Sequence, residues 1–383
     1  MYQKKILFIS NISGEKIGSF SLASIHAAHD VGLEFHIAAN FDRASMEQRE
    51  KDEIEHGIKI HHIDFIRNPM HPGNIKAYRQ LVELIKREKF DIIHCNTPIG
   101  GLCGRLAGKK CGVHEVIYQA HGFHFYKGAP KKNWLIYYPI ERMLAHYTDA
   151  LITINQEDYK AAKRFRLRKN GKVYYVPGVG IDLSVFQVIQ KDKLRQSLEI
   201  KPDDIMLISA GDLVERKNYK VAIRAVKEAR LQNLKYCICG KGPQMDDLKQ
   251  YAKDLGIEKQ IIFLGFCSNI KELYQAADIF LFTTRQEGMP RSMMEAMASG
   301  LPCIASKIRG NTDLISDGNG GYLLDAMDSK GFSKAICTLA EDASLRKKFA
   351  QDNLNTIKQF DINFVSDDVK DVYLAEIGGY SPR

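Results

Sequence analysis

The chain has 383 residues, of which 45% are hydrophobic and 26% charged, as in a soluble globular protein of about two domains. Its formal net charge of +9 favours an anionic partner, which could be a membrane surface, a nucleic acid or a phosphorylated ligand. No apolar run approaches the roughly 20 residues that span a bilayer, and no signal peptide is expected. The eight cysteines form no CxxC pair, so we expect reduced core residues of a cytosolic protein.

The first half of the chain alternates short apolar runs with helical patterns. Helices are expected at 20–29, 74–88 and 98–112. Strands are expected at 5–11, 33–39, 58–65, 91–96 and 116–125, and a last strand with a turn at 173–182. Such alternation with short connections predicts a doubly wound parallel sheet, in which ligands bind at the carboxyl ends of the strands.

Two loops after these strands carry candidate ligand residues. Gly14 lies between the first strand and the first helix, where a helix N-terminus could bind an anion, although an ordinary turn explains it equally well. There is no GxGxxG here to indicate a dinucleotide. His121 stands at the carboxyl end of the fifth strand, where it could meet a ligand or form a structural hydrogen bond. His124 could meet an acceptor or belong to the core.

A basic and aromatic stretch follows at 123–138, with three lysines and the only tryptophan, Trp134. Residues 160–172 then carry seven basic side chains and no acid. Aromatic residues beside lysines suit a protein that lies on an anionic headgroup layer. A solvated helix face with a few core aromatics fits the same residues, so both interpretations stay open.

The second half restarts the alternation after an aperiodic stretch that ends near 202, which places an interdomain crossing there. A hairpin is expected at 318–324, and a terminal helix at 367–377. Further helices are expected at 219–231 and within 330–360. Strands are expected at 205–210, 235–243, 261–265, 279–282 and 303–306.

Three residues of this half suit a phosphorylated ligand. Lys217 lies just before the helix at 219–231, and its compact charge suits a diphosphate. Gly240 and Gly242 end the next strand, where the backbone could approach a ligand closely.

The most informative stretch is 279–307, a buried strand, a turn and a short helix that begins near Pro290 and ends at Gly300. Such a turn directs unbonded N–H groups and the positive end of the helix dipole at one point, which attracts phosphate. Glu287 sits in the turn, and Glu295 on the helix tilts back toward it. Two carboxylates beside an anion site suit a nucleotide sugar, although two glutamates at this spacing also occur by chance.

At these residues, EGMPRSMMEAMASGLP, the chain resembles glycosyltransferase family 4, whose members retain anomeric configuration. The resemblance covers nearly the whole chain. It implies an α/β fold of GT-B type, in which two doubly wound Rossmann-like domains face an interdomain cleft. The N-terminal domain, 1–180, would bind the acceptor, with a C-terminal helix of 365–383 crossing back to it. The C-terminal domain, 181–364, would bind the nucleotide sugar.

The resemblance also implies a cationic site for the diphosphate. Lys217 matches a lysine of the family, but Asp212 stands where the family has an arginine. Arg216 or Arg291 could supply the second cation, and Arg291 is the better placed because it opens the helix.

The other implied roles concern the donor. Glu287 would contact the sugar, Glu295 the ribose hydroxyls, and His121 the sugar from the other domain. The expected catalytic residues are therefore His121, Lys217 and Glu287. The expected donor-binding residues are Gly14, Arg216, Gly240, Gly242, Phe266, Gly288, Met289, Pro290, Arg291, Ser292 and Glu295.

The segments AHGFHFYKGAP, ITINQEDY and VPGVGID resemble the branch that builds capsular, exopolysaccharide and lipid-linked oligosaccharide chains. This implies a retaining hexosyltransferase that needs no metal and no cofactor. Its donor would be a nucleotide sugar, with UDP favoured only by resemblance, and its acceptor a polyprenyl-diphosphate-linked glycan. The enzyme would be cytoplasmic and peripheral on the anionic inner face of the cytoplasmic membrane.

Other functions fit parts of the same pattern. A GT-B relative could epimerise or hydrolyse a nucleotide sugar without an acceptor. A non-catalytic subunit could bind a nucleotide sugar without turnover. Asp212, which stands where the family has an arginine, slightly favours this alternative. No nucleic-acid partner is expected, because the basic run lacks a recognised module.

Overall fold

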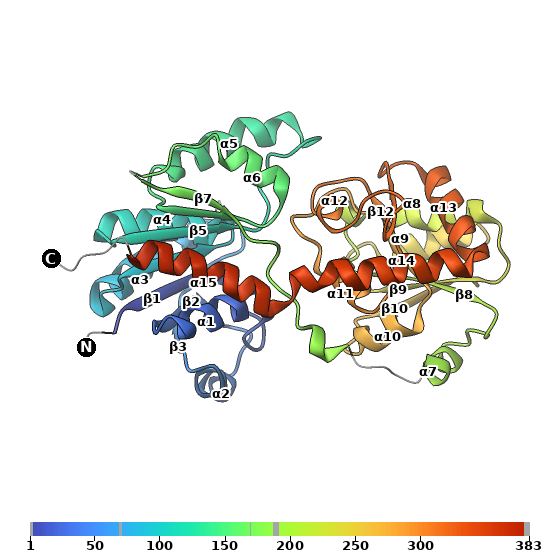
Figure 1. Cartoon of the computed structure of the whole chain (residues 1–383), viewed down its shortest axis with the longest axis horizontal. Coiled ribbons are helices and arrows are strands. Elements are labelled where there is room, and N and C mark those ends of the chain that lie inside the picture. Colours follow the sequence, from blue (N-terminus) through green and yellow to red (C-terminus); the bar gives the residue numbers. More distant parts are fainter. Residues whose placement is uncertain (1–2, 69–70, 169, 187–190, 379–383) are drawn as a thin grey trace. The chain divides into compact units, whose positions relative to one another are not determined.

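A computed structural model of the chain describes residues 3–68, 71–168, 170–186 and 191–378 (Figure 1). By their contacts the residues form two compact units. The first combines Met1–Gly180 with Ile362–Arg383, and the second is Ile181–Asp361. Each unit is built on one parallel sheet with a buried apolar cluster on either face.

The sheet of the first unit has seven strands in the order β3-β2-β1-β4-β5-β6-β7. These strands are β1 (Lys5–Ile12), β2 (Glu34–Asn40), β3 (Lys59–His62), β4 (Ile92–Asn96), β5 (Glu115–Ala120), β6 (Ala150–Thr153) and β7 (Lys172–Tyr175). The helices are α1 (Ser19–Asp30), α2 (Met46–His56), α3 (Gly73–Glu88), α4 (Pro98–Cys111), α5 (Lys131–Ala145), α6 (Gln156–Ala162) and α15 (Ile362–Gly378).

The strands form where apolar runs are buried on both sides. In β1, Leu7 belongs to the cluster on one face of the sheet and Phe8 to the cluster on the other. Successive side chains of a strand point to opposite faces, so a continuous apolar run is what a doubly covered parallel sheet requires. The terminal helix α15 packs along α1 (Figure 1), where Tyr373 Oη lies 2.7 Å from Nδ1 of His94 on β4.

The sheet of the second unit has six strands in the order β10-β9-β8-β11-β12-β13. They are β8 (Ile205–Ala210), β9 (Leu234–Cys239), β10 (Ile261–Gly265), β11 (Ile279–Phe282), β12 (Cys303–Ser306) and β13 (Gly321–Leu324). The α-helices are α7 (Lys191–Ser197), α8 (Tyr219–Ala229), α9 (Met245–Asp254), α10 (Ile270–Ala276), α11 (Arg291–Ala298), α12 (Asn311–Leu314), α13 (Ser329–Glu341) and α14 (Ala343–Thr356). Three short 3-10 helices are η1 (Leu183–Val185), η2 (Glu215–Lys217) and η3 (Ile357–Phe360).

Several expectations about these elements were wrong. The strands expected at 58–65, 116–125 and 235–243 end earlier, at His62, Ala120 and Cys239. The segment at 318–324 is not a hairpin, because β13 pairs in parallel with β12 as an edge strand of the sheet. The terminal helix begins at Ile362 rather than at 365 or 367, because Ile362 and Val365 belong to the same buried face. Within the described ranges, no helix is both long enough and apolar enough to cross a bilayer.

Candidate active site

The carboxyl ends of the second sheet meet at a switch point between β8 and β11. From β8 the chain adds β9 and β10 on one side, and it then places β11 and β12 on the other. Ligands of open α/β sheets bind at such a point, because the loops above it diverge. Lys217 follows β8 and Glu287 follows β11, so two of the expected catalytic residues flank the switch point.

Lys217 and Glu287 form an ion pair there. Lys217 Nζ lies 2.8 Å from Glu287 Oε1, and both side chains are about nine-tenths buried. Thr284 Oγ1 donates to the same oxygen at 2.9 Å, and Arg216 Nη1 lies 3.1 Å from it. Three donors therefore converge on one carboxylate oxygen. The lysine is held in a desolvated position, where its charge acts more strongly on an anion than it would in water.

The turn that carries Glu287 packs against a second turn, which contains Arg309 and Gly310. Buried Arg309 donates from Nε to Glu287 O at 2.8 Å. Gly310 has a φ of 80°, and a Cβ on it would lie 2.5 Å from Gly288 O. Gly310 is thus a close-packing position. No sequence pattern indicates Arg309, because its contact depends on the pairing of β11 with β12.

The helix α11 begins directly after Pro290, which is its N-cap rather than its first helical residue. The first amides, at Arg291 and Ser292, therefore precede the intrahelical bonds and can meet an anion. Glu295 Oε1 accepts from Arg291 Nε at 2.8 Å. Because the arginine is exposed, this i,i+4 pair contributes only about 0.3–0.5 kcal/mol, and a ligand can replace it.

The loops after β8 and β9 approach each other closely. Gly240 has a φ of 152°, and a Cβ there would lie 2.0 Å from Gly211 O. A Cβ on Gly242 would lie 2.4 Å from Leu213 O. Both glycines are needed for this packing. Phe266 follows β10 and is largely exposed, so the carboxyl edge also offers an aromatic ring on which a base could stack.

In the first unit, His121 follows β5, one strand from the switch point between β1 and β4. Its Nε2 lies 2.8 Å from Asn96 Oδ1, so the ring carries its proton on Nε2. Its Nδ1 is buried and has no hydrogen-bond partner within the described part of the chain. Burial lowers the pKa of His121 to about 4. The neutral ring can therefore accept a hydrogen bond from a hydroxyl at Nδ1.

Two neighbours of His121, Asn96 and Phe20, and the residue after Asn96, Thr97, were missed in the sequence. Asn96 ends β4, and Thr97 caps α4 at a φ of 64°, a strained conformation for a β-branched residue. The exposed ring of Phe20 lies 5.4 Å from the His121 ring, centroid to centroid. The polar pair Asn96-Thr97, placed between a buried strand and a proline, is the signal that could have revealed this edge.

The remaining candidates of this unit lie apart from those contacts. Gly14 is exposed in the loop between β1 and α1, and a Cβ on it would meet no atom nearer than 3.5 Å. His124 stacks on Tyr137 with ring centroids 4.5 Å apart, which fits the structural interpretation. Among the described residues, no group of three His, Cys, Asp or Glu side chains could hold a metal ion.

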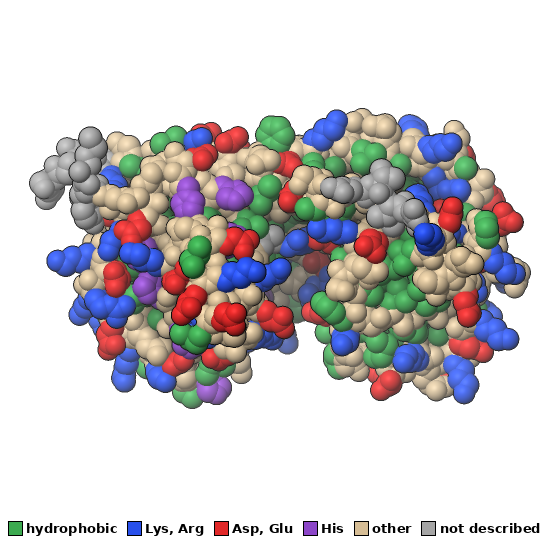
Figure 2. All heavy atoms as spheres, turned by 90° about the horizontal axis from the view of Figure 1, so that it is seen from below, with side chains coloured by type: hydrophobic (Ala, Val, Ile, Leu, Met, Phe, Trp, Pro, Cys, Tyr) green, Lys and Arg blue, Asp and Glu red, His purple; other side chains and the backbone are tan. Residues whose placement is uncertain are grey.

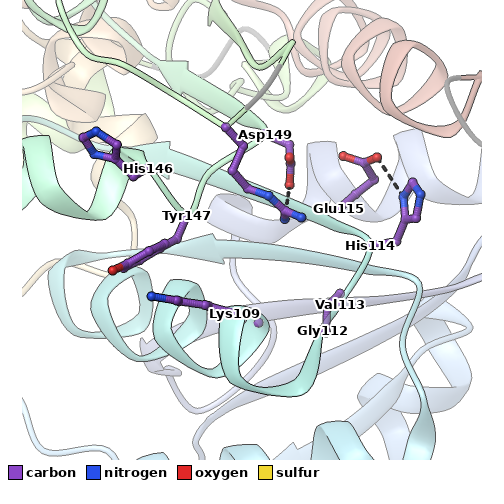
Figure 3. A pocket seen from close by; sticks show the side chains of 10 residues that line it. Lys109, Gly112, Val113, His114, Glu115, His146, Tyr147 and Asp149 are labelled. Carbon is purple, nitrogen blue, oxygen red and sulfur yellow. Dashed lines mark hydrogen bonds and ion pairs between the residues drawn. The ribbon is translucent and has the colours of Figure 1, made fainter.

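A cavity of about 640 Å³ lies at the opposite edge of the first sheet, where β5 and β6 begin (Figure 3). In it Arg168 lies 2.7 Å from Asp149, and His114 lies 2.8 Å from Glu115. Burial, followed by the charges of Asp149 and Glu376, raises the pKa of Glu115 to about 8. Since ligands of such sheets bind at the carboxyl ends, this cavity is not the expected site.

Two family models match the chain, Glycosyl transferases group 1 at residues 190–355 and Glycosyl transferase 4-like at residues 5–155. The protein named glycosyltransferase EpsD of Bacillus subtilis strain 168 is 35% identical over 97% of both chains. The chain belongs to glycosyltransferase family 4. Another relative of this family 4 glycosyltransferase, with 30% identity over 79% of each chain, is the Escherichia coli UDP-Gal:alpha-D-GlcNAc-diphosphoundecaprenol alpha-1,3-galactosyltransferase.

Solved structures confirm the GT-B fold of this family 4 glycosyltransferase. HepE of Anabaena, in complex with UDP and glucose, aligns with a TM-score of 0.80 at 20% identity, over 97% of this chain and 100% of that one. Sucrose-phosphate synthase from Thermosynechococcus elongatus also aligns with a TM-score of 0.80, at 16% identity, over 99% of this chain and 100% of that one. The expected exopolysaccharide and lipid-linked assembly branch is confirmed by the two named relatives. The roles of the individual site residues stay predictions.

Proposed function

We propose that this glycosyltransferase transfers a sugar from a UDP-sugar to a lipid-linked glycan, with retention of the anomeric configuration. The observation that carries the proposal is the Lys217–Glu287 pair at the β8–β11 switch point, beside the first amides of α11. The name of the Escherichia coli relative supports this donor and acceptor class, since it contains UDP-Gal and diphosphoundecaprenol. HepE, which shares the fold, binds UDP and glucose.

The second unit would hold the donor along its carboxyl edge. Lys217 and the amides of Arg291 and Ser292 bind the diphosphate, and Arg216 turns from Glu287 to join them. Glu295 exchanges its bond with Arg291 for the ribose hydroxyls. The exposed ring of Phe266 stacks on the base, and the 288–290 turn borders the sugar.

The first unit would bind the acceptor and assist the transferred sugar. His121 accepts a hydrogen bond from a sugar hydroxyl at Nδ1, and the Gly14 loop provides backbone N–H groups for a phosphate. A lipid-linked acceptor places the enzyme on the inner face of the cytoplasmic membrane, in the synthesis of a surface polysaccharide such as a capsule or exopolysaccharide.

The transfer would proceed on the front face of the sugar. The bond from the anomeric carbon to the diphosphate oxygen breaks as the acceptor oxygen bonds to the same carbon. The leaving phosphate takes the proton of the acceptor hydroxyl. Lys217, Arg216 and the α11 amides stabilise the charge that develops on the diphosphate, so no metal ion is required for that purpose. Glu287 and Glu295 bind the two ends of the donor, and neither acts as a nucleophile.

The test uses the full chain, a panel of nucleotide sugars and a polyprenyl-diphosphate-linked sugar. We expect a glycosylated lipid from a UDP-sugar, with the anomeric configuration of the donor by NMR and an unchanged rate in EDTA. Donor consumed without a glycosylated product would indicate an epimerase or hydrolase instead. Binding without any turnover would indicate a non-catalytic subunit, and either result contradicts the proposal.

A further inference from the structure

The helix α5 (Lys131–Ala145) carries apolar side chains on two opposite faces. Its inner face joins the core through buried Leu144 and through Tyr138, whose ring lies 5.2 Å from Phe125 and 5.6 Å from Phe165. Its other face is exposed at large aliphatic residues. The exposed fractions are 77% for Leu135, 52% for Ile136, 40% for Ile140 and 50% for Met143.

These exposed residues form one continuous stripe. Leu135, Pro139 and Met143 follow one another at intervals of four, and Ile136 and Ile140 run beside them at the same interval. Residues four apart lie on the same side of a helix. We call these five residues the outer stripe. Figure 1 shows α5 at the periphery of the first unit.

Basic residues flank the outer stripe near both ends of α5. Lys131 and Lys132 are exposed one turn before Leu135 and Ile136, and Arg142 is exposed beside Met143. The acid of this helix, Glu141, faces inward, where it lies 2.8 Å from Arg105. The face of the molecule in Figure 2 differs, because acidic and basic side chains are interspersed over it.

We propose that the outer stripe is the surface on which this protein lies on an anionic lipid bilayer. An amphipathic helix binds a membrane with its apolar face at the boundary of headgroups and acyl chains and its lysines at the lipid phosphates. The basic residues beside the outer stripe favour an anionic bilayer over a second copy of the chain. A second copy would place its own lysines against these lysines. Membrane binding would give the enzyme access to a lipid-linked acceptor, and only this biological role rests on the proposed function.

The structure adds the aliphatic residues of the outer stripe to those expected to meet the membrane. Trp134, for which the sequence left a headgroup position and a core position open, contacts Phe125 and Tyr138 with ring centroids 5.5 and 5.9 Å away and stays 42% exposed. These ring contacts hold α5 on the core, and the aliphatic residues of the outer stripe face outward. The basic residues of α6 and the segment after it, such as Lys163 and Arg164, are exposed as well.

The test is sedimentation of the full chain with phosphatidylcholine vesicles, with and without phosphatidylglycerol. We expect binding only to the anionic vesicles, and a partition coefficient about tenfold lower for the double variant Leu135→Gln/Ile140→Gln. Replacing Lys131 and Lys132 by glutamine should lower it about fivefold per lysine. The matched control is Ile54→Gln, on α2 of the same unit, where an isoleucine that is 84% exposed should be replaceable without effect.

Several results would overturn the proposal. Equal binding of wild type and Leu135→Gln/Ile140→Gln would do so, as would equal binding to neutral vesicles. A dimer in sedimentation analysis that this variant abolishes, without vesicle binding by the wild type, would assign the stripe to self-association. Turnover with a short-chain, water-soluble acceptor separates this inference from the proposed function. The variant should keep wild-type turnover, whereas a wild type inactive toward every donor would refute the function alone.

Discussion

Replacing Lys217 by methionine removes one positive charge from the switch point and keeps most of the side-chain volume. Glu287 loses its bond to Nζ at 2.8 Å but keeps the donors Thr284 and Arg216, so unfolding should become easier by only about 1–2 kcal/mol. The transition state loses a desolvated cation beside the leaving diphosphate. Removing one such preorganised group costs about 3–4 kcal/mol, so kcat should fall about 10²- to 10³-fold.

The assay for Lys217→Met is release of the nucleoside diphosphate with saturating acceptor, combined with thermal unfolding of the same preparation. The control is Lys235→Met, because Lys235 is a lysine of the same unit near the amino end of β9, away from the carboxyl edge. A folded Lys217→Met protein whose kcat stays within about threefold of wild type would exclude a catalytic role for Lys217, since a threefold change corresponds to less than 1 kcal/mol.

Four further substitutions test other residues of the two units. Glu295→Ala should raise the Kd for the donor about tenfold in calorimetry and change kcat little, and a large fall in kcat at unchanged Kd would contradict the ribose role. Gly240→Ala should lower Tm by roughly 5–10 °C, because the added Cβ meets Gly211 O. Gly14→Ala should keep the wild-type Tm and weaken donor binding. Equal Tm values for the two variants would contradict the close packing of Gly240 on Gly211. Glu115 keeps its proton in the folded state up to about pH 8 but loses it near 4.5 when unfolded, so stability should fall as pH rises between these values. Glu115→Gln should remove that part of the slope, and an unchanged slope would show that other groups cause it.

The strands of the second unit show what a sequence can predict. The bounds of β10, β11 and β12 agree with the expected ones, because each strand is a short apolar run that ends at a glycine or a polar turn. The helix α2 was missed because its surface is charged almost all round and only Asp52 is buried. The wrong hairpin at 318–324 has a related cause, since the pairing of β13 with β12 is not visible in the local sequence.

The candidate site was predictable as separate residues but not as an arrangement. Lys217 and Glu287 could each be placed at a strand end, whereas their contact follows from β8 lying next to β11 in the sheet. Arg309 could not be found, because its bond to Glu287 O joins two turns that only the fold brings together. The outer stripe of α5 could not be predicted for a similar reason. The helix has apolar residues on both faces, and the local sequence does not show which face packs on the core.

The most direct test of the central claim is a crystal structure of the full chain with UDP bound. We expect β-phosphate oxygens within hydrogen-bond distance of Lys217 Nζ and of an amide at the start of α11, with the ribose hydroxyls on Glu295. A UDP molecule bound elsewhere, with its diphosphate out of reach of both Lys217 and α11, would contradict the proposed donor site.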